Sequence, residues 1–175
     1  MDLTINQTGG INVSNTKAFQ LSSNTNNNNF TASTSSGNIS LSSINAGTGD
    51  VVLTSSLGSI LDADVSSDTT VNVIADSLTL VSKTGIGASG TNGDLDTNVA
   101  TLVPSVSDSG SLIITDTSAV SLSSTSTTSG DVTIATSDGI LTVSGVVSSS
   151  SGNISLTGDD GVAHTATGDL STGST

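Results

Sequence analysis

Acidic side chains are the residues of this chain that come closest to forming a chemical site. All fifteen acidic residues are Asp, and several lie close together in sequence: Asp62, Asp64 and Asp68, then Asp94 and Asp96, then Asp159 and Asp160. Carboxylates and turn carbonyls bind Ca²⁺, which takes about six to eight oxygens. The glycine-rich nonapeptide of calcium-loaded β-rolls is absent, which favours interpreting these Asp residues as turn formers that keep the chain soluble. The calcium candidates are Asp62, Asp64, Asp94 and Asp96.

Two further patterns resemble sites. His164 lies near Ser and Asp residues, but a catalytic triad needs a base that the fold places, and Ser occurs throughout the chain. Residues 85–90, G-I-G-A-S-G, match the dinucleotide-binding pattern G-x-G-x-x-G. That site needs a helix N-terminus, whereas T-N-G-D-L-D follows and Pro104 lies beyond it, which favours a turn. We therefore expect no catalytic residue, no enzyme activity and no cofactor other than calcium.

The charge balance excludes several classes of partner. The chain has two basic residues, Lys17 and Lys83, no Arg, and a net charge of −13. Nucleic acids and anionic membranes need clustered cations, so both are poor partners. Enzymes acting on acidic polysaccharides use stacking aromatics and cations, and the chain has neither Trp nor Tyr. No apolar run is long enough to cross a membrane, and the first residues lack signal-peptide features.

Short strands must position these residues. An apolar-polar-apolar motif recurs along the chain, as in I-N-V at 11–13, F-Q-L at 19–21, F-T-A at 30–32, I-S-L at 39–41, V-V-L at 51–53, V-T-I at 132–134 and I-S-L at 154–156. Alternation places Ile39 and Leu41 on one face of a strand and Ser40 on the other. No segment has helical periodicity. The repetition predicts an all-β coil.

The spacing of the strands predicts the size of one circuit. Strand starts alternate between gaps of about eight and about twelve residues, and turns rich in Gly, Asp, Asn and Ser separate them. Two strands and two turns thus make a circuit of roughly twenty residues, and about eight circuits stacked ~4.8 Å apart give a rod of roughly 40 Å. The longer gap has room for a third short strand, so the sequence leaves open whether the cross-section has two faces or three.

A longer period lies above this one. Ile11 and Val13 match Leu112 and Ile114, at an offset of about 102 residues that five circuits of about twenty also give. We interpret 1–175 as a single β-solenoid segment, with module one at about 10–109 and a partial module two at about 110–175.

Residues 83–109 break the rhythm with a glycine cluster and the single proline. Apolar residues in this segment predict that one irregular circuit still packs into the core: Leu95, Val99, Leu102 and Val103. The rest is expected to bulge as a loop. The asparagine run 26–29 has two alternative interpretations, a stacked ladder of side chains or a loop tip.

Five longer runs of the sequence share a common strand-and-turn pattern. They are D-S-L-T-L-V-S-K-T-G-I-G (76–87), L-D-T-N-V-A-T-L (95–102), G-S-L-I-I-T-D-T-S-A-V-S-L (110–122), G-D-V-T-I-A-T-S-D-G-I-L-T-V-S-G-V-V (130–147) and S-G-N-I-S-L-T-G (151–158). These runs resemble the repeats of filamentous-haemagglutinin-like adhesins and related giant bacterial surface proteins. The resemblance implies a right-handed parallel β-helix, export, and a fibrous or adhesive role at the cell surface.

These expectations give one functional hypothesis and three alternatives. The first is a structural segment of an extracellular fibre, whose partners are other copies or flanking repeats of a longer chain, end to end. The second is an adhesin that binds cell-surface glycans or proteins through the 83–109 loop. Ice binding would need regular Thr pairs on one face, and T-S-T-T at 125–128 is the one dense run. A polysaccharide-acting β-helix is the remaining alternative.

Overall fold

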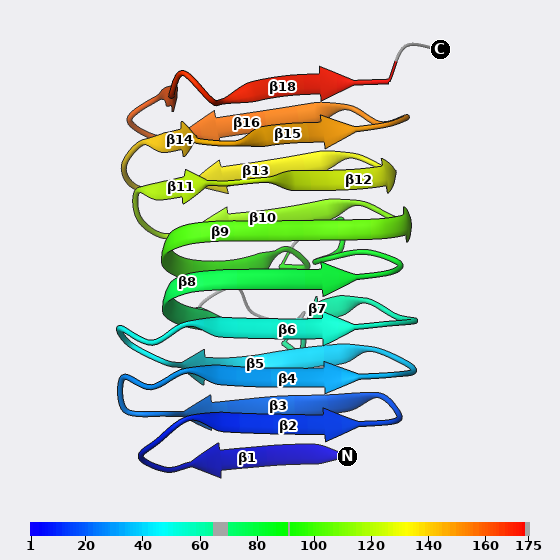
Figure 1. Ribbon diagram of the computed structural model, residues 1–175, viewed down its shortest axis with the longest axis vertical. Coiled ribbons are helices and arrows are strands. Elements are labelled where there is room, and N and C mark those ends of the chain that lie inside the picture. The colour runs from blue at the N-terminus through cyan, green and yellow to red at the C-terminus, as the bar shows by residue number, and fades with distance from the viewer. Residues whose placement is uncertain (65–69, 91, 174–175) are drawn as a thin grey trace.

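The fold is a right-handed coil of parallel β-strands. The computed structural model describes residues 1–64, 70–90 and 92–173, and the regular elements of this part are all strands. In Figure 1 the front strands run from left to right, the back strands return, and the chain rises from the N-terminus to the C-terminus. Successive circuits lie about 21 residues apart in sequence, and about eight of them stack into a rod. Among the described residues, no helix has the length and hydrophobicity needed to cross a membrane.

The strands have the following bounds. In the N-terminal part they are β1 (Asp2–Asn6), β2 (Ile11–Asn15), β3 (Phe19–Asn24), β4 (Phe30–Thr34), β5 (Ile39–Asn45), β6 (Val51–Ser55) and β7 (Ile60–Asp62). The middle holds two long strands, β8 (Val73–Ser82) and β9 (Leu95–Ser109). The C-terminal part has β10 (Leu112–Asp116), β11 (Val120–Leu122), β12 (Thr125–Ser129), β13 (Val132–Thr136), β14 (Leu141–Val143), β15 (Val146–Ser149), β16 (Ile154–Gly158), β17 (Val162–His164) and β18 (Asp169–Thr172).

Two stacks of in-register residues run along the rod. The front stack begins with the parallel pairs β2–β4, β4–β6, β6–β8 and β8–β9. The back stack continues from β3 to β16, and an isolated bridge at one residue carries it through the middle: Phe19, Ile39, Ile60, Ile86, Leu112, Val132 and Ile154. Each circuit therefore hydrogen-bonds to the next along both faces, so neighbouring circuits satisfy each other's backbone groups.

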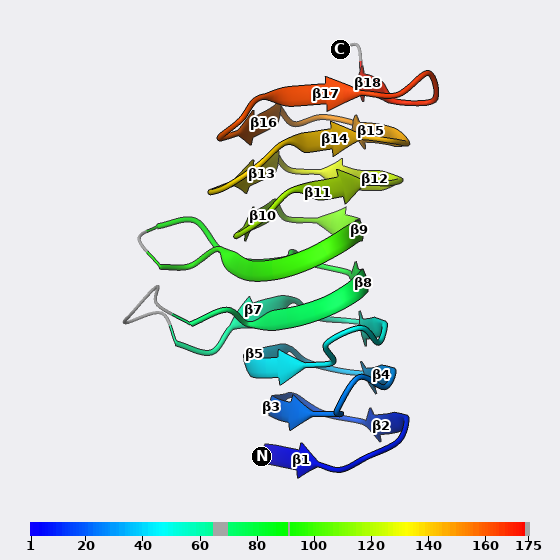
Figure 2. The ribbon, with the colours of Figure 1, turned by 90° about the vertical axis from the view of Figure 1, so that its left-hand side faces the viewer.

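The two halves of the rod differ in cross-section. Circuits of the N-terminal half have two strands, as the sequence predicts, for example β4 and β5. Circuits of the C-terminal half have three, for example β10, β11 and β12, so the third strand that the sequence left open is present there. β9 makes the transition, because both β11 and β12 pair with it. Figure 2 shows β11, β14 and β17 forming the additional narrow side.

Alternation within the strands places the apolar residues in the core. Ile39, Leu41, Phe19 and Phe30 are buried, while Ser40 faces outward and is half-buried. The core is narrow and consists mainly of Ile, Leu and Val, with thirty buried hydrophobic residues forming one cluster among those described. Burial of an apolar side chain of this size contributes about 1.5–3 kcal/mol each, which makes this cluster the main source of stability.

Polar side chains continue the ladder at the turns. Asn29 and Asn38 each accept a hydrogen bond, through Oδ1, from a backbone N–H of the next circuit, at Asp50 and Ser59 respectively (both 3.0 Å). Asp131 does the same for Asn153 (2.8 Å). This explains why Asn or Asp so often precedes an apolar strand residue in the sequence: its side chain bonds a turn N–H that the strand pairing does not reach.

The segment 83–109 is mostly strand, so the expectation that it forms a surface loop is wrong for most of its length. β9 occupies Leu95–Ser109 and pairs with β8 along nine residue pairs. Leu95, Val99 and Leu102 are buried, which confirms that this circuit packs into the core, whereas Val103 faces outward and is half-buried. Among the described residues of this segment, those that leave the coil are 87–90 and 92–94, and a backbone hydrogen bond from Ala88 N–H to the Gly93 carbonyl (2.6 Å) joins the two pieces.

The 102-residue period does not connect equivalent positions of the coil. Four register steps lead from Ile11 through the front stack to Leu102, whereas its sequence match Leu112 lies in the back stack. The matched residues therefore lie on different faces, because the middle circuits are longer than the others. The division into two modules stays a prediction.

Candidate functional site

The strongest candidate for an interaction site is the C-terminal end of the coil. Its three strands each pair with one described neighbour, β16 with β13, β17 with β14 and β18 with β15. Their other edges face away from the rod, as Figure 2 shows at its upper end. Half of the backbone N–H and C=O groups in such edge strands point outward, and an unpaired strand edge is a template for pairing with another strand.

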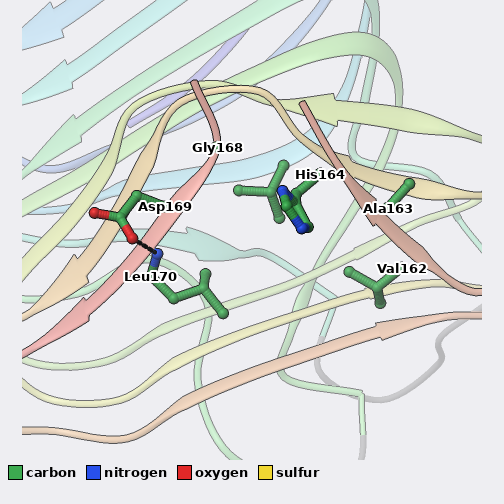
Figure 3. Close-up of a pocket in the computed structure, with 7 residues that line it drawn as sticks. Val162, Ala163, His164, Gly168, Asp169 and Leu170 are labelled. Atoms are coloured by element: carbon green, nitrogen blue, oxygen red, sulfur yellow. Dashed lines mark hydrogen bonds between the residues drawn. The ribbon is translucent and has the colours of Figure 1, made fainter. Parts of the chain in front are cut away.

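Apolar side chains line this end. Val162 and Leu170 are 49% and 57% exposed, although they continue columns that are fully buried one circuit below at Leu141 and Val147. Together with Val143, Ala163 and other end residues they line a recess of about 270 Å³. Figure 3 shows these side chains around His164, with Leu170 N–H donating to the Asp169 carboxylate. The end thus presents a cross-section of the core to solvent.

The N-terminal end has the same character. β1 pairs with β3, and β2 pairs with β4, so one edge of each strand lacks a described partner strand. Leu3, Ile5 and Val13 are partly buried against the core, and no described strand packs on their outer side. Both ends of the rod therefore combine an open backbone edge with incompletely buried apolar residues.

The calcium candidates lie on two neighbouring corners of the coil. Asp62 is buried and accepts hydrogen bonds from Asn72 Nδ2 (2.8 Å) and from the backbone N–H of Asp64 (3.0 Å). Asn72 Oδ1 in turn accepts from the backbone N–H of Asp96 (2.9 Å), and Nδ2 also donates to the Leu41 carbonyl (3.1 Å). Asn72 therefore joins three circuits, and the Asp62 carboxylate takes part in holding them together.

The remaining acidic candidates do not join this cluster. Asp94 accepts a hydrogen bond from the Thr115 hydroxyl, on the next circuit. Asp159 and Asp160 lie exposed in the turn between β16 and β17, and Asp68 lies outside the described residues. Within the described ranges, no group of three His, Cys, Asp or Glu side chains is placed to hold a metal ion. Calcium binding stays a prediction from residue type.

Sequence reasoning missed the most deeply buried acid, Asp116. Its carboxylate is fully buried and accepts from the Thr97 hydroxyl (2.7 Å), the Val99 N–H (3.1 Å), and the Ser118 N–H (2.9 Å) and hydroxyl (3.1 Å). Burial raises the pKa of Asp116, and these hydrogen bonds partly offset the rise. The sequence gives little indication of this burial, since T-D-T-S at 115–118 is typical of an ordinary turn. The contacts link β9 to the first three-stranded circuit.

The glycine pattern at 85–90 forms a turn on either side of a core residue. Gly85, Gly87 and Gly90 all have positive φ, and no helix begins among the described residues that follow. Between the first two glycines, Ile86 enters the core and bridges Ile60 and Leu112. At this level of the back stack, the single residue Ile86 therefore takes the place of a strand.

The asparagine run closes a corner of the coil. Asn26 and Asn27 have positive φ, and Asn28 Nδ2 donates to the carbonyls of Thr25 (2.9 Å) and Asn26 (3.0 Å). Asn27 Oδ1 accepts from the N–H of Thr48 in the next circuit (3.3 Å). Of the two interpretations left open, the turn is the one observed.

His164 lies on β17 at the open end. Its ring Nδ1 lies 3.2 Å from the carbonyl of Thr165, and the residue is exposed. Neither a Ser hydroxyl nor a carboxylate among the described residues is hydrogen-bonded to the ring, so the geometry of a triad is not formed there.

Comparisons with protein-family models, with curated proteins and with solved structures found no match to this chain.

Proposed function

We propose that this chain is a structural segment of an extracellular fibrous protein or filament, which is extended by stacking further β-circuits on its ends. The observation that carries the proposal is the C-terminal end, where three adjacent strand edges and the exposed side chains of Val162 and Leu170 face solvent together. Solenoid proteins cover such ends with a polar cap when the coil stops, since each repeat is stabilised by its neighbours.

A further circuit would satisfy both kinds of exposed group at once. Its backbone would pair with the outward N–H and C=O groups of β16, β17 and β18, and its apolar residues would bury Ile154, Leu156, Val162 and Leu170. The added circuit could come from flanking residues of a longer chain or from another copy. Either source extends the rod along its axis.

The sides of the rod support a structural function. Outward positions of the front stack are uncharged, as in the aligned series Ser14, Ser33, Thr54, Val81, Ser105, Ser126, Ser148 and Ser171. Most of the described Asp residues and both Lys residues lie in turns or near strand ends, and Lys83 and Asp108 make an exposed ion pair of 3.9 Å. Small uncharged faces with acidic groups near the strand ends keep a fibre hydrated. The resemblance to exoprotein repeats agrees with export to the cell surface.

The proposal is tested by imaging the protein in the organism that makes it. An antibody raised against the 175-residue chain should label fibres at the cell surface in immunogold electron microscopy, with label repeated along the fibre. Label confined to the cell interior, or to compact surface particles without fibres, would contradict the proposal.

The adhesin alternative keeps one supporting observation. Residues 87–90 and 92–94 project from the side of the coil in Figure 2, whereas β9 is part of the rod. Because Ala88 N–H and the Gly93 carbonyl are hydrogen-bonded, residues 89–92 can be deleted and the two ends joined with little strain. An adhesive loop predicts that this deletion abolishes binding to surface glycans or proteins while the β-rich circular dichroism spectrum persists. Unchanged binding removes the alternative.

A further inference from the structure

We infer that the C-terminal end of this chain takes the N-terminal end of a second copy, head to tail, with β1 on β16 and β2 on β18. The inference rests on the proposed function and names the partner and the register of the contact. It follows from three features: the continuity of the residue columns, the junction that already exists in the middle of the rod, and the polarity of the strands.

The residue columns at the two ends continue one another. Leu3 pairs with Leu21, two residues after Phe19 in the back stack, and Leu156 lies two residues after Ile154 at the other end of the same stack. Val13 begins the front column that ends at Leu170. Extending the register by one circuit places Leu3 over Leu156 and Val13 over Leu170, so the contact would bury partly exposed apolar residues against each other.

The different cross-sections of the two ends are compatible, because the molecule already contains such a junction. β9 is a single strand of a long circuit, yet β11 pairs with its residues Thr101 and Leu102 and β12 with its residues from Ser105 onward. One strand can therefore lie against two. The same geometry lets β2 lie over β18 and the end of β17, with Ile11 over His164.

Strand polarity favours head-to-tail association over head-to-head association. The strand pairs of the described residues are parallel all along the rod, from β1–β3 to β15–β18. A second copy added in the same orientation continues this parallel pairing and the right-handed coil. A head-to-head pair would reverse the strands at the contact, so the parallel pairing and the right-handed coil would end there. The head-to-tail contact is heterologous and leaves open edges at both ends, so it propagates.

Cysteine cross-linking tests this register, because the chain has no cysteine of its own. Thr4 and Thr157 face outward, are exposed, and occupy adjacent positions when Leu3 lies over Leu156. Adjacent strand positions bring Cα atoms to about 5 Å, within reach of a disulfide. Under mild oxidation the Thr4→Cys/Thr157→Cys double variant should form a ladder of dimers, trimers and longer species on a non-reducing gel.

Matched variants separate the possible arrangements. Thr4→Cys alone forms dimers only in a head-to-head pair, and Thr157→Cys alone forms dimers only in a tail-to-tail pair, so both should stay monomeric on the gel. The pair Gln7→Cys/Thr157→Cys, three residues out of register, should give less than one tenth of the ladder. Sedimentation velocity and electron microscopy of the unmodified chain should show rods longer than one copy.

The outcomes distinguish this inference from the proposed function. Rods in solution with cross-links from a single-cysteine variant would overturn the head-to-tail register while leaving axial stacking intact. A chain that stays monomeric at all accessible concentrations would exclude a second copy as the partner, although fibres labelled at the cell surface would still support the proposed function through flanking circuits.

Discussion

The interior of the rod and its C-terminal circuit contain the same kinds of residue in different environments. Leu141 of β14 is fully buried, whereas Leu170 of β18 is 57% exposed, although both point toward the axis of the coil. The difference is that circuits lie on both sides of Leu141 and on one side of Leu170. Stability in this fold thus comes from neighbouring circuits, and an end circuit is stabilised about half as well as an interior one.

The largest expected difference comes from truncating these two leucines. Leu141→Ala should lower the free energy of unfolding by about 2–5 kcal/mol, because it removes buried apolar surface and leaves a cavity. Leu170→Ala should lower it by less than about 1 kcal/mol, because that side chain is already hydrated. Urea unfolding followed by circular dichroism, at a concentration where the chain is monomeric, measures both. Equal losses would show that the end circuit is as well packed as the interior.

Two glycines in equivalent turns sharpen the comparison. Gly139 and Gly161 both have positive φ, so replacement by Ala strains the backbone at either position by about 1–2 kcal/mol. An added Cβ at Gly139 would lie 2.8 Å from the backbone N of Ala119, whereas at Gly161 it would meet nothing within 4 Å. Gly139→Ala should therefore lower the thermal midpoint distinctly more than Gly161→Ala. A larger effect at Gly161 would contradict the register of the last circuits.

Asp116 predicts a pH dependence that exposed acids do not share. Because burial raises its folded-state pKa above the unfolded value, its contribution to stability is fully present at pH below the unfolded pKa and is lost as pH rises through the folded pKa. Acidification from neutral pH should thus stabilise the chain through this group. Asp116→Asn should remove that increment and should also cost about 1–3 kcal/mol, since an amide nitrogen cannot accept from the Val99 N–H or the Thr97 hydroxyl.

The control for this effect is Asp138→Asn, in an exposed turn. The free energy of unfolding is measured at several pH values for both variants and the unmodified chain. The comparison separates the contribution of Asp116 from the general relief of charge repulsion. A pH profile of Asp116→Asn parallel to that of the unmodified chain would show that the buried carboxyl does not titrate in this range.

Salt should act on association more than on the fold. The chain carries a net charge of −13, and Asp159, Asp160 and Asp169 lie on the circuit that would meet a second copy. Raising ionic strength shortens the Debye length from ~10 Å at 0.1 M to ~3 Å at 1 M, so the dissociation constant of the rods should fall several-fold. Asp169→Asn should reduce this salt dependence. Association that weakens with salt would argue against contact between these acidic ends.

The sequence predicted the coil because its strongest signal is local. Alternation in I-S-L at 39–41 and the spacing of such motifs indicate which side chains face inward and how long a circuit is. The last strand of each three-stranded circuit, β12 or β15, was harder to predict, because these strands place Thr125, Thr127 and Ser149 in the interior and their sequences do not alternate between apolar and polar residues.

Contacts between distant parts of the chain explain where the predicted placement of other residues differs from the structure. Pro104 suggested a loop, yet it is buried in β9, where Val99 and Val106 on either side pack into the core. Asn72 lies between Val71 and Val73 in the sequence, where strand alternation would point it outward, but β8 begins at Val73, and Asn72 is buried and bonds Asp62. The open ends could be anticipated from the sequence, whereas the columns that relate them required the register of every strand pair.

Hydrogen exchange, compared between dilute and concentrated solutions, tests the central claim most directly. Amides in β1, β2 and β16–β18 that point away from the rod should exchange rapidly in dilute solution and slow by at least tenfold when copies stack, because each gains a strand partner. Amides of β10–β15 should not change, since they are paired in both conditions. Protection that rises with concentration at both ends alone would support axial stacking. Rods that form without protection of either end would contradict it.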